Sequence, residues 1–154
     1  MDITTAASKP ALAASRVLRR TLLGLLIALV VQATLGAGVN LYLTTPTSAR
    51  GAGVFAAFGK AISDGGTALA VHAALGALIT LGSIAALVRA VRVRRWPAIM
   101  ACTAGFVCLL GAFASGAAFV GDTKSGSSMA MAVLTGAAMI VYLLAYSTIA
   151  TARD

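Results

Sequence analysis

The sequence predicts an all-α integral membrane protein, a four-helix transmembrane bundle. Of its 154 residues, 60% are hydrophobic and only 10% are charged, whereas a soluble domain has about 45–50% apolar and about 25% charged residues. A chain of this length cannot bury so much apolar surface in a core of its own, so lipid must surround most of it. Four apolar stretches are long enough to cross a bilayer as helices, and none has the alternating polarity of a membrane β-strand.

The chain divides into a tail, a transmembrane domain and a second, very short tail. Residues 1–20 form the first tail, whose small and polar residues without a hydrophobic period predict a flexible cytoplasmic segment. Residues 152–154 form the second tail. The transmembrane domain covers residues 21–151, and its predicted spans are 21–43, 67–88, 97–120 and 128–151. Each has the roughly 20 residues that a helix needs to cross a hydrocarbon core of about 30 Å.

Basic residues flank the spans unevenly and predict the orientation of the chain. One side has nine: Lys9, Arg16, Arg19, Arg20, Arg89, Arg92, Arg94, Arg95 and Arg153. The other side has Arg50, Lys60 and Lys124. The positive-inside rule then places both termini in the cytoplasm, in a multi-pass protein of the cell inner (plasma) membrane. The net charge of +8 is explained by topology and by attraction to membrane lipids, so nucleic acid is not an expected partner.

The first outer loop, residues 44–66, contains a candidate short helix. In the segment GVFAAFGKAISDGG, the apolar residues Val54, Phe55, Phe58 and Ile62 recur at helical spacing. Two interpretations remain open, an interfacial helix lying in the outer headgroup region and a loop that only covers the end of the bundle.

His72 and Met131 are the candidate ligands of a cofactor. His72 is the only histidine of the chain and lies about 7 Å below the outer end of the second span, at the depth of Met131 on the fourth. An ionisable residue inside a span is a candidate functional residue. Histidine and methionine form a known axial pair for heme iron, which predicts heme b held by both residues in a pocket between these spans. Met129 is an alternative to Met131, and a neutral imidazole bonded to a neighbouring helix is the alternative for His72.

Three further residues belong to the predicted heme site. Gly76 lies one turn below His72, and Gly136 lies just over one turn below Met131, where a flat macrocycle needs small residues. Helix packing through small residues explains the same glycines equally well. Asn40, near the outer end of the first span, is predicted to orient the imidazole by accepting a hydrogen bond from its free nitrogen.

The segments VQATLGAGVNLYLTTP of the first span and AVHAALGAL of the second resemble the opening half of heme A synthase. The resemblance implies a four-helix unit in which outer-side histidines on the second and fourth helices hold a heme, and His72 matches the first of them. Met131 or Ala132 stands where the second histidine is expected, and residues 44–66 lack the family's cysteine pair and acidic residue. The prediction is therefore heme binding, without heme A synthesis.

The sequence thus predicts a small heme protein for electron transfer or heme handling at the outer side, and it identifies no catalytic residue. Two other classes remain open. One is a non-catalytic scaffold subunit that packs through glycine and alanine faces in a homo-oligomer or a larger membrane complex. The other is a lipid- or quinone-binding protein with one histidine in an apolar pocket. Cys102 and Cys108 lie on different faces of one predicted helix, so they cannot pair with each other.

Overall fold

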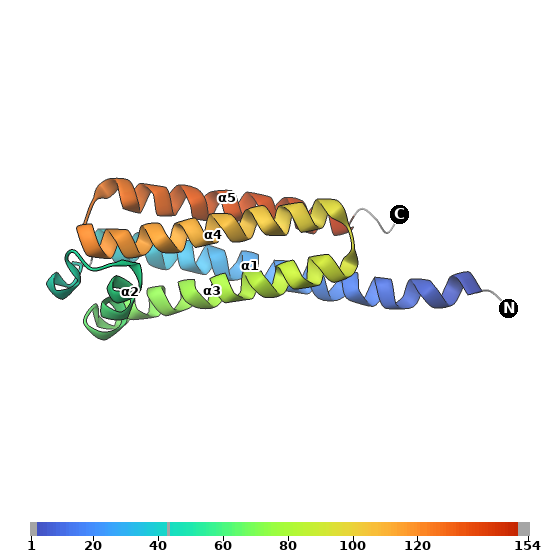
Figure 1. Ribbon diagram of the computed structural model, residues 1–154, viewed down its shortest axis with the longest axis horizontal. Helices are drawn as coiled ribbons and strands as arrows, with labels where there is room; N and C mark the ends of the chain where they lie inside the picture. Colours follow the sequence, from blue (N-terminus) through green and yellow to red (C-terminus); the bar gives the residue numbers. More distant parts are fainter. Residues whose placement is uncertain (1–2, 43, 151–154) are drawn as a thin grey trace.

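The computed structural model describes the backbone of residues 3–42 and 44–150. Helices and loops account for all of these residues, without a strand, so the predicted fold class is confirmed. In chain order the elements are α1 (Ile3–Tyr42), the 3-10 turn η1 (Thr47–Ala49), α2 (Val54–Ser63), α3 (Gly66–Val93), α4 (Trp96–Asp122) and α5 (Ser125–Ala150). Figure 1 shows α1, α3, α4 and α5 as long, roughly aligned helices.

Four helices are long and apolar enough to cross a membrane, which makes the chain an integral membrane protein. The candidate spans are Leu12–Tyr42, Gly66–Val93, Trp96–Asp122 and Ser125–Ile149. They overlap the predicted spans, and the first and second extend further at the ends that carry arginines, because arginine does not interrupt a helix. The helix α3 continues to Val93, and its C-cap Arg94 has a left-handed φ of 57°. Leu43 and residues 151–154, with the predicted second tail, lie outside the described residues.

The N-terminal segment differs from the prediction of a flexible tail. The helix α1 begins at Ile3 and continues without a break into the first span, and its first part projects beyond the other helices (Figure 1). Alanine is frequent in this segment and has the highest helix propensity. The adjoining span also provides the first helical turns, so the segment does not need a nucleus of its own. Residue 20 therefore marks no structural boundary.

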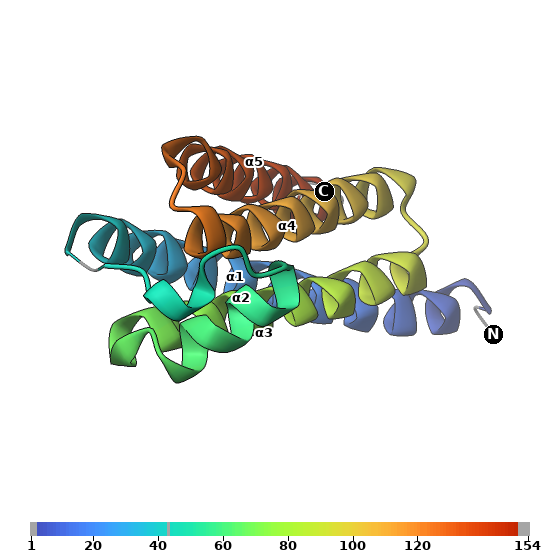
Figure 2. The same cartoon turned by 60° about the vertical axis from the view of Figure 1, so that its left-hand side comes forward.

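The four long helices form a closed ring in which sequence neighbours are spatial neighbours. Their most extensive contacts join α4 to α5 and α1 to α3, and contacts of α3 with α4 and of α1 with α5 complete the ring. Figure 2 shows the two pairs, α4 with α5 and α1 with α3. The helices α3 and α5, which carry His72 and Met131, are therefore diagonal to each other.

The core divides into two clusters along the bundle. The larger cluster includes four leucines of α1 at helical spacing together with the fully buried Tyr142. The ring of Tyr142 lies so close to Gly105 of α4 that a Cβ on this glycine would be 2.6 Å from its Cζ. The smaller cluster joins α2 to the ends of α3 and α4, with Ala57, Ala61 and Leu69 among its members. The end of the bundle beside this smaller cluster is called the α2 end below.

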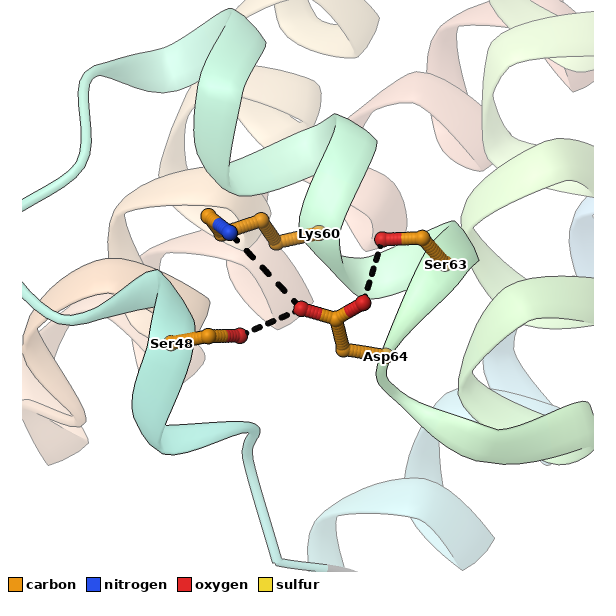
Figure 3. A network of polar contacts seen from close by, with 4 residues as sticks. All are labelled: Ser48, Lys60, Ser63 and Asp64. Atoms are coloured by element: carbon orange, nitrogen blue, oxygen red, sulfur yellow. Dashed lines mark hydrogen bonds and ion pairs between the residues drawn. The ribbon is translucent and has the colours of Figure 1, made fainter.

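The predicted helix of the first outer loop exists as α2, which packs on α3 and α4 across this end of the bundle. The rings of Phe58 and Phe113 meet there, with centroids 5.1 Å apart. Asp64, directly after α2, joins this helix to η1 (Figure 3). Its carboxylate accepts hydrogen bonds from Ser48, at 2.5 Å, and from Ser63, at 2.7 Å. The hydrogen bond from Ser48 is the main reason why the pKa of Asp64 is lowered.

Candidate functional site

A cavity of about 440 Å³ lies inside the bundle at the α2 end. Ligand pockets commonly have volumes of about 300–1,000 Å³. All four long helices line it and α2 contributes Phe58 and Ala61, so the cavity belongs to the whole ring and not only to the predicted second and fourth spans. Its walls are mainly apolar, and the polar side chains in them are those of Gln32, Asn40, His72, Thr80, Ser128 and Thr135.

His72 and Gln32 form a polar pair between α3 and α1 in this wall. The amide nitrogen of Gln32 donates a hydrogen bond to the backbone carbonyl of His72, at 3.0 Å, and lies 3.4 Å from the imidazole Nε2. Because the backbone carbonyl oxygen of His72 can only accept a hydrogen bond, the end of the Gln32 amide that faces α3 is its nitrogen. We assign the imidazole Nε2 as the acceptor for the same amide group, which in a neutral ring places the proton on Nδ1.

Two glycines make room for this pair in a reciprocal way. A Cβ on Gly36 of α1 would lie 2.8 Å from Cε1 of His72, and a Cβ on Gly76 of α3 would lie 3.0 Å from the amide nitrogen of Gln32. Each helix therefore places a glycine opposite the polar side chain of the other. The amide of Gln32 thus fills the space beside Gly76, which also lines the cavity.

Two polar atoms of the pair are buried and have no hydrogen-bond partner among the described residues. They are Oε1 of Gln32, which is an acceptor, and Nδ1 of His72, which is the donor in the tautomer assigned above. A buried polar group that stays unsatisfied costs about 1–3 kcal/mol. The pair therefore offers one acceptor and one donor to any group that can reach them.

The structure separates the two candidate methionines of α5. Met131 lines the cavity, and its sulfur would be 3.0 Å from a Cβ on Gly116 of α4. Met129 is 67% exposed and does not line the cavity. Gly136 also lines it, with open space where a Cβ would stand. His72, Met131, Gly76 and Gly136 therefore line one cavity, and their role as a ligand site stays a prediction.

Asn40 lines the same cavity but is bonded to a different partner than expected. Its Oδ1 accepts a hydrogen bond from the hydroxyl of Ser128, at 3.1 Å, which links α1 to α5 at the α2 end. The side chain that contacts the imidazole is that of Gln32. Gln32 lies eight residues before Asn40 in α1, a little over two helical turns toward the N-terminus.

The residues that line the cavity are most exposed where α1 faces α5. Its lining residues from α3 and α4 are all buried or half-buried, whereas Ala33 and Ala37 of α1 and Ala132 of α5 are exposed. We call these three alanines the lateral window. All three lie within candidate membrane spans. The bond between Asn40 and Ser128 closes the same seam at the α2 end.

Sequence reasoning missed the pairing of Gln32 with His72, although the sequence carries a signal for it. The segments QATLGA, residues 32–37, and HAALGA, residues 72–77, have the same pattern of a polar residue followed four positions later by glycine. On antiparallel helices this spacing lets each polar side chain meet the glycine of the other helix.

No family model matches the chain, and no curated protein or solved structure matches it either. The resemblance to heme A synthase therefore stays a prediction that rests on the residues around Gln32 and His72.

Proposed function

We propose that this integral membrane protein binds a small, mainly apolar molecule that carries carbonyl or hydroxyl groups, a quinone or a similar lipid, in the cavity at the α2 end. The observation that carries the proposal is a pair of buried, unsatisfied atoms, Oε1 of Gln32 and Nδ1 of His72, on two residues that line the apolar cavity. Both atoms are covered in the described structure, so the proposal requires the two side chains to turn them toward the ligand. A carbonyl oxygen of the ligand would accept from His72, and a hydroxyl would donate to Gln32. The apolar remainder would occupy the space lined by alanine, leucine and phenylalanine.

The lateral window supports this class of ligand over a water-soluble one. A molecule dissolved in the bilayer reaches the window between Ala33, Ala37 and Ala132 without leaving the apolar phase. At the α2 end, in contrast, the cavity is covered by α2, where Phe58 packs on Phe113. The binding step therefore takes place at the protein–lipid boundary.

The test is a titration of the full chain in detergent with a short-chain alkyl benzoquinone. We expect Gln32→Leu and His72→Ala each to weaken binding by about tenfold, the value of one buried hydrogen bond of about 1.4 kcal/mol. Thr34→Val is the matched control, because Thr34 is exposed on α1 and bonds only its own helix at the Val30 carbonyl. Unchanged affinity in both test variants, with the fold intact, would overturn the proposal.

Heme b is a second candidate ligand, and the shared placement of His72 and Met131 in one cavity favours it. Both donor types suit heme iron, and a methionine ligand raises the reduction potential, so the heme would supply one-electron transfer. The donor chemistry fits, but the imidazole would have to release its contact with Gln32 to free Nε2. His72 and Met131 are the residues that would hold the group.

An absorption spectrum of the purified protein, oxidised and then reduced, separates the two candidates. Heme predicts a Soret band that sharpens on reduction and that His72→Ala abolishes. Met131→Leu should then shift the spectrum, whereas Met129→Leu, at the exposed position, should not. A protein without a visible band after expression with ample heme, or one equally coloured without His72, would rule out heme at this site and leave the quinone or lipid ligand.

A further inference from the structure

A second hollow lies at the opposite end of the seam between α1 and α5. Its volume is about 280 Å³, and it is lined by Arg16, Arg19, Arg20, Leu23 and Tyr146. Three of its five side chains are thus arginines, whose guanidinium groups suit the recognition of phosphate and carboxylate. We call these five residues the arginine groove.

Tyr146 of α5 positions one of the arginines. The Nε of Arg19 donates a hydrogen bond to the Tyr146 hydroxyl, at 3.1 Å, and the guanidinium carbon lies 5.2 Å from the centre of its ring. The guanidinium therefore has both a hydrogen bond and a cation–π contact to hold it against α5. Because this hydrogen bond uses Nε alone, the terminal nitrogens retain donors for a second acceptor.

The described part of the chain offers no carboxylate to the arginine groove. Within residues 3–42 and 44–150 the acidic residues are Asp64 and Asp122, and these pair with Lys60 and Lys124 at the α2 end. Arg89, the arginine of α3 that contacts α1 nearby, bonds the hydroxyl of Thr21. Among the described residues the groove is therefore a cationic site without a carboxylate, at the end of two spans.

An apolar strip continues from the arginine groove into the membrane-spanning part of α1. Leu23 and Ile27 follow Arg16 and Arg20 at helical spacing and so lie on the same face of the helix. Leu23 is 46% exposed and Ile27 is 59% exposed. A ligand that fits this arrangement has an anionic group beside a long apolar chain.

We propose that the arginine groove binds the phosphate group of an anionic membrane phospholipid, whose acyl chain runs along Leu23 and Ile27. Arginine suits this role because its planar donors match phosphate oxygens. Basic pockets between transmembrane helices are a known form of lipid headgroup site. Free phosphate shares the headgroup chemistry but would leave the apolar strip without a function, so the experiment must distinguish the two sources.

The experiment measures lipid retained by the full chain after detergent exchange, by native mass spectrometry. The protein is loaded from mixed micelles that contain equal amounts of phosphatidylglycerol and phosphatidylcholine. We expect wild type to retain phosphatidylglycerol preferentially, and the triple variant R16Q/R19Q/R20Q to lose this preference, because each arginine near a headgroup contributes about a fivefold gain in affinity. The matched control is R92Q/R94Q/R95Q, which removes three exposed arginines of the same end outside the groove.

Tyr146→Phe provides a second variant that leaves every charge in place. It removes the hydroxyl that positions Arg19, so we expect a loss of preference of about fivefold with an unchanged elution profile of the protein. Equal retention of both lipids by wild type would overturn the proposal, and so would a preference that survives in both the triple variant and Tyr146→Phe. Displacement of phosphatidylglycerol by millimolar inorganic phosphate would overturn the assignment to a lipid.

Discussion

The imidazole of His72 lies directly against the backbone of Gly36, so that a Cβ at this glycine would stand 2.8 Å from the ring atom Cε1. One turn deeper, Gly76 gives the same room to the amide of Gln32. The helices α1 and α3 thus approach closely at the place where Gln32 and His72 contact each other in the described cavity wall. Helix packing and the ligand binding proposed above therefore involve the same four residues.

Substitution of Gly36 is expected to damage the site, whereas substitution of Gly38 is not. Gly36→Ala forces the imidazole or the helices apart, which should destabilise the protein by about 1–3 kcal/mol. Gly38 has no heavy atom within 4 Å of a built Cβ, so Gly38→Ala should leave stability equal or raise it by about 0.5–1 kcal/mol. Thermal unfolding in detergent measures both. Equal midpoints for the two variants would contradict the role of Gly36.

Gln32 and His72 should be energetically coupled. A double-mutant cycle with Gln32→Leu and His72→Ala is expected to give a coupling free energy of about 0.6 kcal/mol, the average for hydrogen bonds between membrane helices, and at most about 1.7 kcal/mol. Unfolding free energies in mixed micelles provide the four values. Strict additivity would mean that the contact of the Gln32 amide with the imidazole Nε2, at 3.4 Å, contributes nothing to stability, since the backbone carbonyl of residue 72 remains in all four variants.

A large side chain in the lateral window should slow ligand entry. Ala132→Trp places an indole between α1 and α5, so we expect the association rate constant of the alkyl benzoquinone to fall by about tenfold or more. Ala104→Trp is the control, because Ala104 is exposed on α4 and does not line the cavity. Stopped-flow binding measures the rates. A normal rate in Ala132→Trp would show that the ligand enters by another route.

Gly105 is expected to be intolerant of any side chain. Gly105→Ala brings a Cβ to 2.6 Å from Tyr142 Cζ, and a rigid aromatic ring cannot yield as a flexible side chain does, so a loss of about 1–3 kcal/mol follows. Gly24→Ala, which meets open space, is the control for the substitution itself. In the Tyr142→Leu background the cost of Gly105→Ala should shrink, and a cost that remains the same in chemical denaturation would contradict the clash.

Acidification should loosen the loop that joins α1 to α3. The pKa of Asp64 lies below its ordinary value of 3.8 in the folded protein, mainly because Ser48 donates to its carboxylate. The ionised carboxylate of Asp64 therefore stabilises the loop fully above pH 3.8. This stabilisation is lost as the pH falls through the lower pKa that Asp64 has in the folded protein. Ser48→Ala should raise the pKa of Asp64, measured by NMR titration of its carboxyl carbon. Thr47→Ala, in the same turn but outside the network of Figure 3, should not.

The sequence was sufficient for the four spans and for the cavity at the depth of His72, because apolar length and the position of a lone histidine are local properties of the chain. The contact of Gln32 with His72 depends instead on the relative rotation of α1 and α3, which side-chain spacing on one helix does not specify. The predicted contact of Asn40 with the imidazole rests on its depth in the span alone, and depth does not determine which neighbouring side chain a residue contacts. In the structure Asn40 accepts a hydrogen bond from Ser128. The helical N-terminal segment cannot be predicted from periodicity, because a polar, alanine-rich stretch lacks an apolar period even when it continues an existing helix.

The exposed lining residues Ala33, Ala37 and Ala132 determine the concentration scale on which the affinity of a membrane-dissolved ligand is expressed. A ligand that enters through lipid equilibrates with its mole fraction in the bilayer or micelle, and its bulk molarity in water is nearly irrelevant. Doubling the detergent at constant ligand therefore halves the effective ligand activity and should halve site occupancy in the dilute regime. In a native membrane the same chemistry allows a modest intrinsic affinity to give high occupancy, because the bilayer itself collects the ligand.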